Sequence, residues 1–218
     1  AGNDGIHTQW SSGLDIMNNT ISGSGDDGID VNHSKGLNVS GNTVTDSGDD
    51  GINIFHAFGA TVSRNTVDGT GDEGIQITDV DSLIVTANTV TNSVNDGIQI
   101  DDSTDILVDG NIVNNNGTEG IEINNSTGIV VSNNTVTENG NGVSLNGVSD
   151  VMVEGNTISD NTNNGLSVVG GDSITIFNNI IEYNDIGVYL EDVFGVTVEE
   201  NMLTIYLTSG IEIVRGDE

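Results

Sequence analysis

Apolar residues recur along this chain with a period of 22 or 23 residues. Each repeat can be aligned on a glycine followed by an aliphatic residue, and positions in the repeat are counted from that glycine. These glycines are Gly5, Gly28, Gly51, Gly74, Gly97, Gly120, Gly142, Gly165, Gly187 and Gly210. Positions +1, +3, +9, +11 and +16 are apolar in nearly every repeat, as in Ile121, Ile123, Ile129, Val131 and Val136.

The apolar positions alternate with polar ones, which is the period of a β-strand with one buried face. Gly, Asn, Ser and Asp separate the runs, so one repeat predicts three short strands, for example over 121–123, over 129–131 and around 136. No window carries an apolar stripe at helical spacing. A single repeat buries almost nothing, so the repeats must stack on one another.

Stacked parallel strands with right-handed crossovers form a solenoid. The pattern therefore predicts an all-β fold, a single-stranded right-handed parallel β-helix of about ten coils of 22–23 residues, with three short strands per coil. At about 4.8 Å per coil, the solenoid would be about 45–50 Å long.

The repeat runs through residues 1–218, which predicts one domain. Neither end of the sequence shows an amphipathic helix to cover the exposed sheet edges. We therefore expect a domain that lacks its own end caps. Two alternatives remain open: the caps lie on sequence outside these residues, or other copies cover the ends by stacking head to tail into filaments.

Position +14 is the most regular polar position in the repeat. It is Asn in all nine complete repeats: Asn19, Asn42, Asn65, Asn88, Asn111, Asn134, Asn156, Asn179 and Asn201. An inward Asn at a corner satisfies backbone groups and pairs with the Asn one coil on. We expect a structural ladder here and no binding site.

Acidic residues dominate the charge: 34 Asp and Glu against three Lys and Arg, for a net charge of −31. Nucleic-acid binding needs clustered bases, so this balance excludes it. No apolar run is long enough to span a membrane, which predicts no membrane insertion. The absence of Cys leaves no disulfide framework to indicate the compartment.

Segments such as "GIQIDDSTDILVDGNIV" and "GIEINNSTGIVVSNNTV" resemble the parallel β-helix repeats of the carbohydrate-binding and sugar-hydrolase superfamily. That superfamily includes polygalacturonases, pectate lyases, mannuronan epimerases and NosD-like periplasmic proteins. The resemblance covers the whole chain. It implies the β-helix fold, a polysaccharide partner and an extracellular or cell-surface location.

The residue before the repeat glycine is acidic in the first six repeats, and in three of them a second acid precedes it. Like charges stacked about 4.8 Å apart repel one another unless a proton, salt or a cation intervenes. Three interpretations remain open: a solvated acidic turn, a Ca²⁺-binding edge, and catalytic carboxylates. The candidate metal ligands are Asp4, Asp26, Asp27, Asp49, Asp50, Asp72, Glu73 and Asp96.

Polygalacturonases place one Asp a coil below an Asp pair, and Asp4 with Asp26 and Asp27 is similar to that arrangement. The family pattern continues with Gly-His-Gly one coil on and with Arg-x-Lys further along. Neither segment occurs in this sequence. The resemblance to polygalacturonases therefore does not extend to a complete hydrolytic site.

All three histidines, the only Trp and two of the three bases lie in the first 64 residues, where Trp10, His33 and His56 share position +5 and should stack. His33 and His56, with Asp79 next in that column, also make a partial transition-metal set. Positions +2 and +4 form a flat outward face, which suits a glycan or is an ordinary polar exterior. The candidate glycan-binding residues are Trp10, Asp30, Asn32, His33, Asn53, Phe55, His56 and Gln76.

Two functions follow from these candidates. The first is an extracellular structural or adhesive module that binds cations, Ca²⁺ among them, and polysaccharide. The alternative is a polysaccharide hydrolase, lyase or epimerase, with acid–base candidates His7, Asp27, His33 and His56 and with Lys35 and Arg64 to neutralise a uronate. Repeats of 22 or 23 residues leave no long loops to build a cleft, which favours the module.

Overall fold

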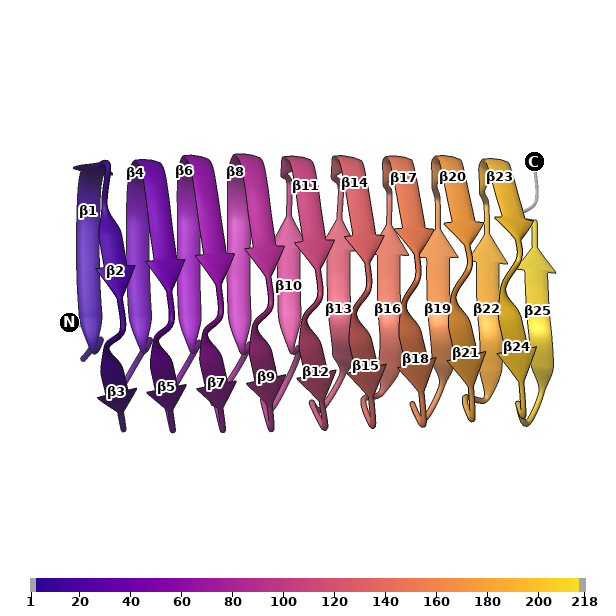
Figure 1. Cartoon of the computed structure of the whole chain (residues 1–218), viewed down its shortest axis with the longest axis horizontal. Coiled ribbons are helices and arrows are strands. Elements are labelled where there is room, and N and C mark those ends of the chain that lie inside the picture. Colours follow the sequence, from indigo (N-terminus) through magenta and orange to yellow (C-terminus); the bar gives the residue numbers. More distant parts are fainter. Residues whose placement is uncertain (1–2, 216–218) are drawn as a thin grey trace.

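The computed structural model describes residues 3–215, which form a stack of parallel β-coils. Consecutive coils lie side by side along the long axis, with the N- and C-terminal ends of the chain at opposite ends of the stack (Figure 1). The described residues contain nine complete coils and the first strand of a tenth, and no helix. The predicted all-β solenoid is confirmed.

The first four coils contain strands that are longer than predicted. Their strands are β1 (Ile6–Ser12), β2 (Asp15–Met17), β3 (Thr20–Ser22), β4 (Ile29–Ser40), β5 (Thr43–Thr45), β6 (Ile52–Ser63), β7 (Thr66–Asp68), β8 (Ile75–Thr86) and β9 (Thr89–Thr91). In β4, β6 and β8 the first two predicted strands are fused into one strand of 12 residues. β4 turns the corner at His33 and Gly36, both with positive φ, because a left-handed residue redirects the chain without ending its pairing.

From the fifth coil on, each complete coil has the three separate short strands that the repeat predicts. These strands are β10 (Ile98–Asp101), β11 (Thr104–Asp109), β12 (Ile112–Asn114), β13 (Glu119–Asn124), β14 (Thr127–Ser132), β15 (Thr135–Thr137), β16 (Asn141–Asn146), β17 (Ser149–Glu154), β18 (Thr157–Ser159), β19 (Asn164–Val169), β20 (Asp172–Phe177), β21 (Ile180–Glu182), β22 (Ile186–Glu191), β23 (Phe194–Glu199), β24 (Met202–Thr204) and β25 (Ser209–Val214).

The register places each residue opposite its equivalent in the next coil. Ile29 pairs with Ile52, and Ile52 pairs with Ile75, so position +1 forms one continuous buried column. Positions +3, +9, +11 and +16 form similar columns, and together they make the core. Because parallel strands keep equivalent side chains in contact, a narrow aliphatic core serves the whole length.

The predicted asparagine ladder is present at position +14. The backbone N–H and the Nδ2 of Asn88 both donate to Asn111 Oδ1, at 2.9 and 3.0 Å, and Asn88 Nδ2 also donates to the carbonyl of Val62 at 2.9 Å. The same bonds recur from coil to coil. The ladder therefore satisfies a column of buried backbone groups at one corner.

A second asparagine ladder was not predicted. It occupies position +19 in the C-terminal half, through Asn116, Asn139, Asn161 and Asn184. The first coils carry Ser or Thr at this position, so the sequence column is mixed and its signal is weaker.

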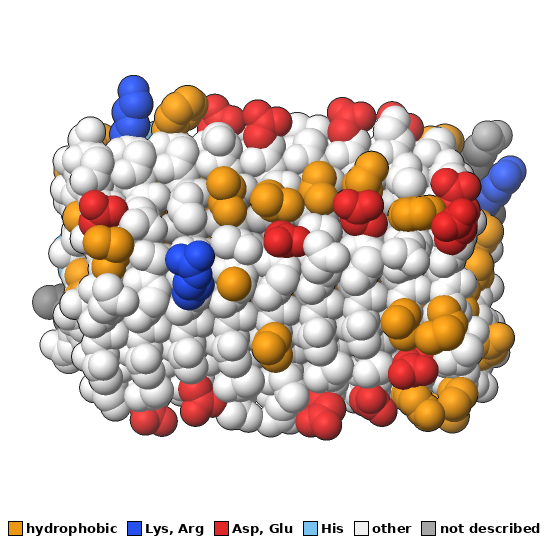
Figure 2. Space-filling model, in the orientation of Figure 1, with side chains coloured by type: hydrophobic (Ala, Val, Ile, Leu, Met, Phe, Trp, Pro, Cys, Tyr) orange, Lys and Arg blue, Asp and Glu red, His pale blue; other side chains and the backbone are white. Residues whose placement is uncertain are grey.

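The C-terminal end of the described chain exposes inward positions. Ile211 and Ile213 of β25 are 43% and 66% exposed, although they continue columns that are buried in the second to ninth coils. Figure 2 shows hydrophobic side chains gathered toward this end. No helix in the described residues is long and apolar enough to cross a membrane. That the domain lacks its own caps stays a prediction.

Candidate functional site

An aromatic column follows the first turn of the first three coils. Trp10, His33 and His56 stack on one another, with ring centroids 4.1 Å apart for Trp10 and His33 and 4.8 Å apart for His33 and His56. Phe55 meets His33 edge-on, 5.8 Å between centroids. The stack is confirmed as the sequence placed it, at one residue per coil.

This column adopts a backbone conformation that Trp rarely takes. Trp10, His33 and His56 have φ of 58°, 56° and 57°, in the left-handed region. The fourth to ninth coils have Asp, Asn or Gly at the same position, which are the residues that accept this region at low cost. The first coils thus hold bulky rings where the backbone favours small polar residues, and such strain is common at functional sites.

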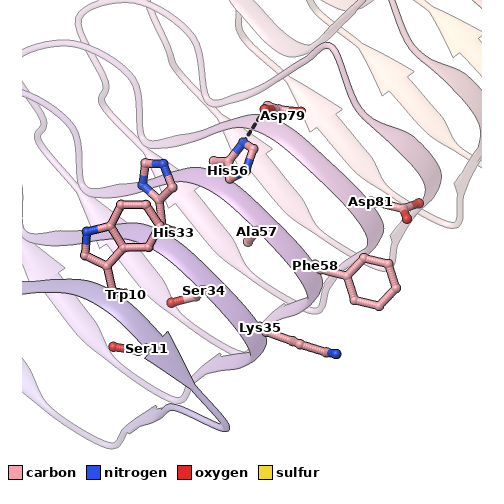
Figure 3. Close-up of a pocket in the computed structure, with 10 residues that line it drawn as sticks. All are labelled: Trp10, Ser11, His33, Ser34, Lys35, His56, Ala57, Phe58, Asp79 and Asp81. Carbon is pink, nitrogen blue, oxygen red and sulfur yellow. Dashed lines mark hydrogen bonds and ion pairs between the residues drawn. The ribbon is translucent and has the colours of Figure 1, made fainter.

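The column forms one wall of a shallow trough of about 450 Å³, which we call the aromatic trough. Its second wall is Lys35, Phe58 and Asp81 at position +7, and position +6 provides the floor (Figure 3). The complete lining is Trp10, Ser11, His33, Ser34, Lys35, His56, Ala57, Phe58, Asp79 and Asp81. Lys35 Nζ lies 5.7 Å from the centre of the Phe58 ring, a cation–π contact.

Phe58 and Asp81 were not among the candidates from the sequence. Their signal was the column at position +7, which reads Lys35, Phe58 and Asp81 in three successive coils. Arg64 is at position +13, at another turn, and does not line the trough. Of the two predicted uronate-neutralising bases, the structure places Lys35 beside the aromatic column.

His56 has a carboxylate partner inside the trough. Its Nδ1 lies 2.5 Å from Asp79 Oδ2, and the pair is drawn with a dashed line in Figure 3. The carboxylate holds the ring by Nδ1, which leaves Nε2 for a ligand or a proton. Within residues 3–215, no three-ligand metal cluster contains His33 or His56, because their rings stack and do not converge.

The predicted flat face is present but is mostly bonded to itself. Gln76 Nε2 donates to Gln99 Oε1 at 3.2 Å, Asn32 Nδ2 donates to Asp30 Oδ1 at 2.7 Å, and Asn53 Nδ2 donates to Asp27 Oδ2 at 3.1 Å. The candidate glycan residues therefore divide in two. Trp10, His33 and His56 line the trough with Phe55 beside them, whereas Asp30, Asn32, Asn53 and Gln76 form a cross-linked sheet surface.

The acidic pairs line one edge of the solenoid, and their two members differ in environment. The outer acids reach the surface: Asp49 is exposed, and Asp26 and Asp72 are half-buried. The inner acids Asp27, Asp50, Glu73 and Asp96 are all buried. The interpretation of a solvated acidic turn is therefore wrong for the inner acids.

The inner acids form a ladder of their own. Asp27 Oδ1 accepts the backbone N–H of Asp50 at 3.1 Å, and Asp50 Oδ1 accepts that of Glu73 at 3.0 Å. Asn164 N–H donates to Asn141 Oδ1 in the same way, at 3.0 Å, two coils after the acids end. Each of these acids therefore accepts a backbone N–H from the next coil, as Asn141 does in a later coil.

Burial disfavours the charged form of the inner acids. It raises the pKa of Asp27 to about 6 and the pKa of Asp96 to about 7, against hydrogen bonds that lower both values. Burial and a hydrogen bond to Glu73 raise the pKa of Asp50 to about 9, and burial also raises the pKa of Glu73. At neutral pH the centre of this ladder thus holds a proton between Asp50 and Glu73.

Three groups of described residues bring metal-ligand atoms within 4.8 Å of one another. They are Asp26–Asp27–Asp49, Asp49–Asp50–Asp72 and Asp4–His7–Asp30. The first two lie on the predicted acidic edge. The third includes His7, which the sequence singled out as an acid–base candidate, and Asp30, which it singled out as a glycan ligand.

Three solved structures of similar shape are polysaccharide enzymes by title. The A-module of the Azotobacter vinelandii mannuronan C-5 epimerase AlgE4 has a TM-score of 0.72 at 16% identity, over 91% of this chain and 60% of that chain. The periplasmic alginate epimerase AlgG has a TM-score of 0.68 at 19% identity, over 84% of this chain and 51% of that chain. The GH87 alpha-1,3-glucanase of Streptomyces thermodiastaticus strain HF3-3 has a TM-score of 0.65 at 18% identity, over 96% of this chain and 50% of that chain.

At these identities the likeness shows the fold alone, and the chain spans between 50% and 60% of the length of these structures. No curated protein matches the sequence. The model of the right-handed beta helix region matches residues 1–103 and 73–218. The two matched segments together cover the whole sequence, so the chain belongs to the right-handed beta helix family.

Proposed function

We propose that the protein is an extracellular β-helix module that binds polysaccharide in the aromatic trough. The observation that carries this proposal is the left-handed conformation of Trp10, His33 and His56. A left-handed non-glycine residue costs about 1–2 kcal/mol, and it persists where a surface benefits from it. Asn and Gly at the same position in later coils show that the fold itself does not need the rings.

The trough has the elements of a sugar site. Trp10 and Phe58 are 72% and 54% exposed, and their flat faces suit the apolar faces of sugar rings. Lys35, Asp79 and Asp81 supply charged groups on the same two walls for hydroxyl or carboxylate groups. The walls follow the long axis, one residue per coil, so an extended chain suits the trough better than a compact ligand.

The three solved structures support this ligand class, since their titles name alginate, mannuronan and alpha-1,3-glucan enzymes. A uronate polymer would place its carboxylates toward Lys35. A net charge of −31 opposes such a polymer elsewhere on the surface, so binding would depend on ionic strength or on bridging cations.

The acidic edge and the ends of the solenoid belong to the same proposal. Ca²⁺ would bind the outer carboxylates Asp26, Asp49 and Asp72, with the inner acids behind them. The exposed Ile211 and Ile213 would pack against the first coil of a second copy, which extends the solenoid into a filament.

A polysaccharide-active enzyme is the second candidate, and the pair of His56 and Asp79 favours it. An imidazole held by a carboxylate at 2.5 Å is a suitable general base, and it lies in the trough with Lys35. Turnover of a polyuronide that is lost in His56→Ala and retained in His7→Ala would establish this function in place of the module.

The intrinsic fluorescence of Trp10 tests the binding proposal directly. Trp10 is the only Trp in the sequence and lines the trough, so a bound sugar should quench or shift its emission. Titration with alginate, polygalacturonate and a neutral glucan would identify the ligand class.

Two phenylalanines give a matched pair of variants, because Phe58 and Phe194 both occupy position +7 and both are exposed. Phe58→Ala should weaken binding about three- to tenfold, and Phe194→Ala should leave it unchanged. An unchanged Trp10 emission with all three polymers would refute the trough as a polysaccharide site.

A further inference from the structure

The first two coils bring together a histidine and two carboxylates. Strands β1 and β4 pair in parallel with His7 opposite Asp30, and this register sets the two side chains against each other. His7 Nδ1 lies 2.6 Å from Asp30 Oδ2 and 3.5 Å from Asp4 Oδ2. One nitrogen and two oxygens from three residues thus lie within 4.8 Å of one another.

The surroundings orient these groups. Asn32 Nδ2 donates to Asp30 Oδ1 at 2.7 Å, which leaves Oδ2 directed toward His7. The side chains of Asp4 and Asp30 are 14% and 12% exposed, whereas that of His7 is 51% exposed. The carboxylates are therefore recessed, and the site opens to solvent on the histidine side. Hydrogen bonds that hold a ligating carboxylate are typical of metal sites.

The same three positions one coil on form a closed arrangement. There the residues are Asp27, Asp30 and Asn53, and the amide of Asn53 donates to Asp27 Oδ2 at 3.1 Å. A neutral amide donor satisfies the carboxylate and leaves no ligand nitrogen. Among the described coils, only the first pair supplies an imidazole at this position.

We propose that Asp4, His7 and Asp30 bind a divalent transition-metal ion, with Zn²⁺ as the reference ion. Nδ1 of His7 and one oxygen from each carboxylate would be the ligands, and water would complete the coordination. The imidazole nitrogen distinguishes this site from the all-oxygen acidic edge, because nitrogen suits Zn²⁺ and oxygen suits Ca²⁺.

The competing explanation is an ordinary ion pair between His7 and Asp30. The chain holds its own control for this, because His56 and Asp79 make an equally short pair without a third ligand. A metal site predicts that the two histidines differ in their response to metal, whereas ion pairs predict that they behave alike.

The test is calorimetric titration of the protein with Zn²⁺, with Co²⁺ absorption spectra as a direct report of nitrogen and oxygen ligation. We expect one strong Zn²⁺ site that a large excess of Ca²⁺ does not displace. His7→Asn, which introduces the residue found at this position two coils on (Asn53), should weaken this site at least tenfold. Asn32→Ala should weaken it less, and His56→Asn should leave it intact.

Two results would overturn the proposal: no strong Zn²⁺ binding by the unaltered protein, or binding that survives His7→Asn and is lost in His56→Asn. Far-UV circular dichroism of each variant checks that the first coil is still folded. If His7→Asn disturbs that coil, the unaltered protein still decides the outcome, because its Co²⁺ spectrum must show coordination that depends on an imidazole.

Discussion

Asp50 lies buried beneath Glu73, and its Oδ1 accepts the backbone N–H of Glu73 at 3.0 Å. The two side chains also share a hydrogen bond, which requires a proton on one of them. Burial and this bond raise the pKa of Asp50 to about 9, so the proton is present at neutral pH. A repeat that looks like a row of negative charges therefore contains a neutral rung.

Replacement of Asp50 by Asn should stabilise the protein at pH 7–9. The amide keeps the acceptor for Glu73 N–H and replaces the shared proton with a permanent donor, as Asn141 does in a later coil. We expect a gain of about 1–3 kcal/mol in the free energy of unfolding. This corresponds to a melting temperature higher by about 2–4 °C per kcal/mol.

Chemical denaturation at pH 5 and pH 8 measures this gain, which should be larger at pH 8. Asp102→Asn is the matched control, because Asp102 is exposed and Asn125 occupies its position in the next coil. An equal effect of the two substitutions would mean that the gain comes from lower net charge and not from the buried rung.

Stability should fall as the pH rises from about 4 to about 9. The folded pKa values of Asp27, Asp96 and Asp50 are about 6, 7 and 9, each above the usual 3.8. At a pH between the usual and the raised pKa, the folded state binds more protons than the unfolded state, so stability falls as the pH rises. The contribution of these three acids to stability is therefore complete below about pH 4 and is lost as the pH passes each raised pKa.

Melting temperatures across pH 4–9 check this profile. Repulsion among surface acids acts in the same direction, so the series should be repeated in 1 M NaCl, where the Debye length is about 3 Å. A profile that becomes flat in high salt would assign the effect to the surface and not to the buried ladder.

Replacement of an asparagine by alanine should destabilise the protein much more at the centre of the ladder than at its end. Asn111 accepts two bonds from Asn88 and donates one to the carbonyl of Val85, and all of these groups are buried. Asn111→Ala leaves them unsatisfied, and we expect a loss of about 3–5 kcal/mol. Asn201 is the last rung of the ladder and is half-buried. Asn201→Ala should therefore lower the free energy of unfolding by only about 1 kcal/mol. Urea denaturation of both variants gives the comparison, and equal losses would contradict the ladder's role.

The columns were predictable from sequence because parallel stacking repeats every position. The period of the repeat and the alternation of a strand are enough to predict the column of Ile29, Ile52 and Ile75. The same alternation, continued backward from +1 across the glycine, places position −1 inward. Burial of Asp50 was therefore encoded in the sequence, but a run of acids beside Gly left a solvated turn, a Ca²⁺-binding edge and catalytic carboxylates all open.

Other features depend on turn geometry that the alternation does not contain. The left-handed residue at +5 reverses the alternation, so His33 and His56 point outward and Ser34 and Ala57 point inward. A Cβ on Gly51 would lie 2.3 Å from Val67 Cγ1, so this position must stay without a side chain. The two walls of the aromatic trough arise from such turns, whereas the contact of His7 with Asp30 follows from their shared position +2.

Calcium should raise the melting temperature if the outer acids bind it. At a Ca²⁺ concentration about 100 times Kd, binding adds about 2.7 kcal/mol, or about 5–10 °C for a chain of this size. NaCl at matched ionic strength should give a smaller rise, and Asp49→Asn should reduce the response, because Asp49 belongs to both acidic clusters. Light scattering in the same runs reports filament growth. Equal shifts with NaCl and CaCl₂ would rule out a specific Ca²⁺ site.

Replacement of Trp10 by Asn should weaken polysaccharide binding and leave the stability of the protein nearly unchanged. Trp10→Asn gives the left-handed position a residue that accepts it, which recovers about 1–2 kcal/mol, and removes a ring contact with His33 that contributes about 0.5–1.5 kcal/mol. The two effects nearly cancel, so the free energy of unfolding should stay within about 1 kcal/mol of the original value. Polysaccharide binding, measured by affinity electrophoresis because the fluorescent reporter is lost, should fall at least tenfold.

Asn125→Ala is a suitable control, since it changes the same position at a coil that does not line the trough. It should leave binding unchanged. A Trp10→Asn protein that unfolds more easily and still binds would show that the ring serves the fold, and the trough would then lose its main support as a binding surface. A protein of unchanged stability that no longer binds would show that the strained ring is retained for the ligand.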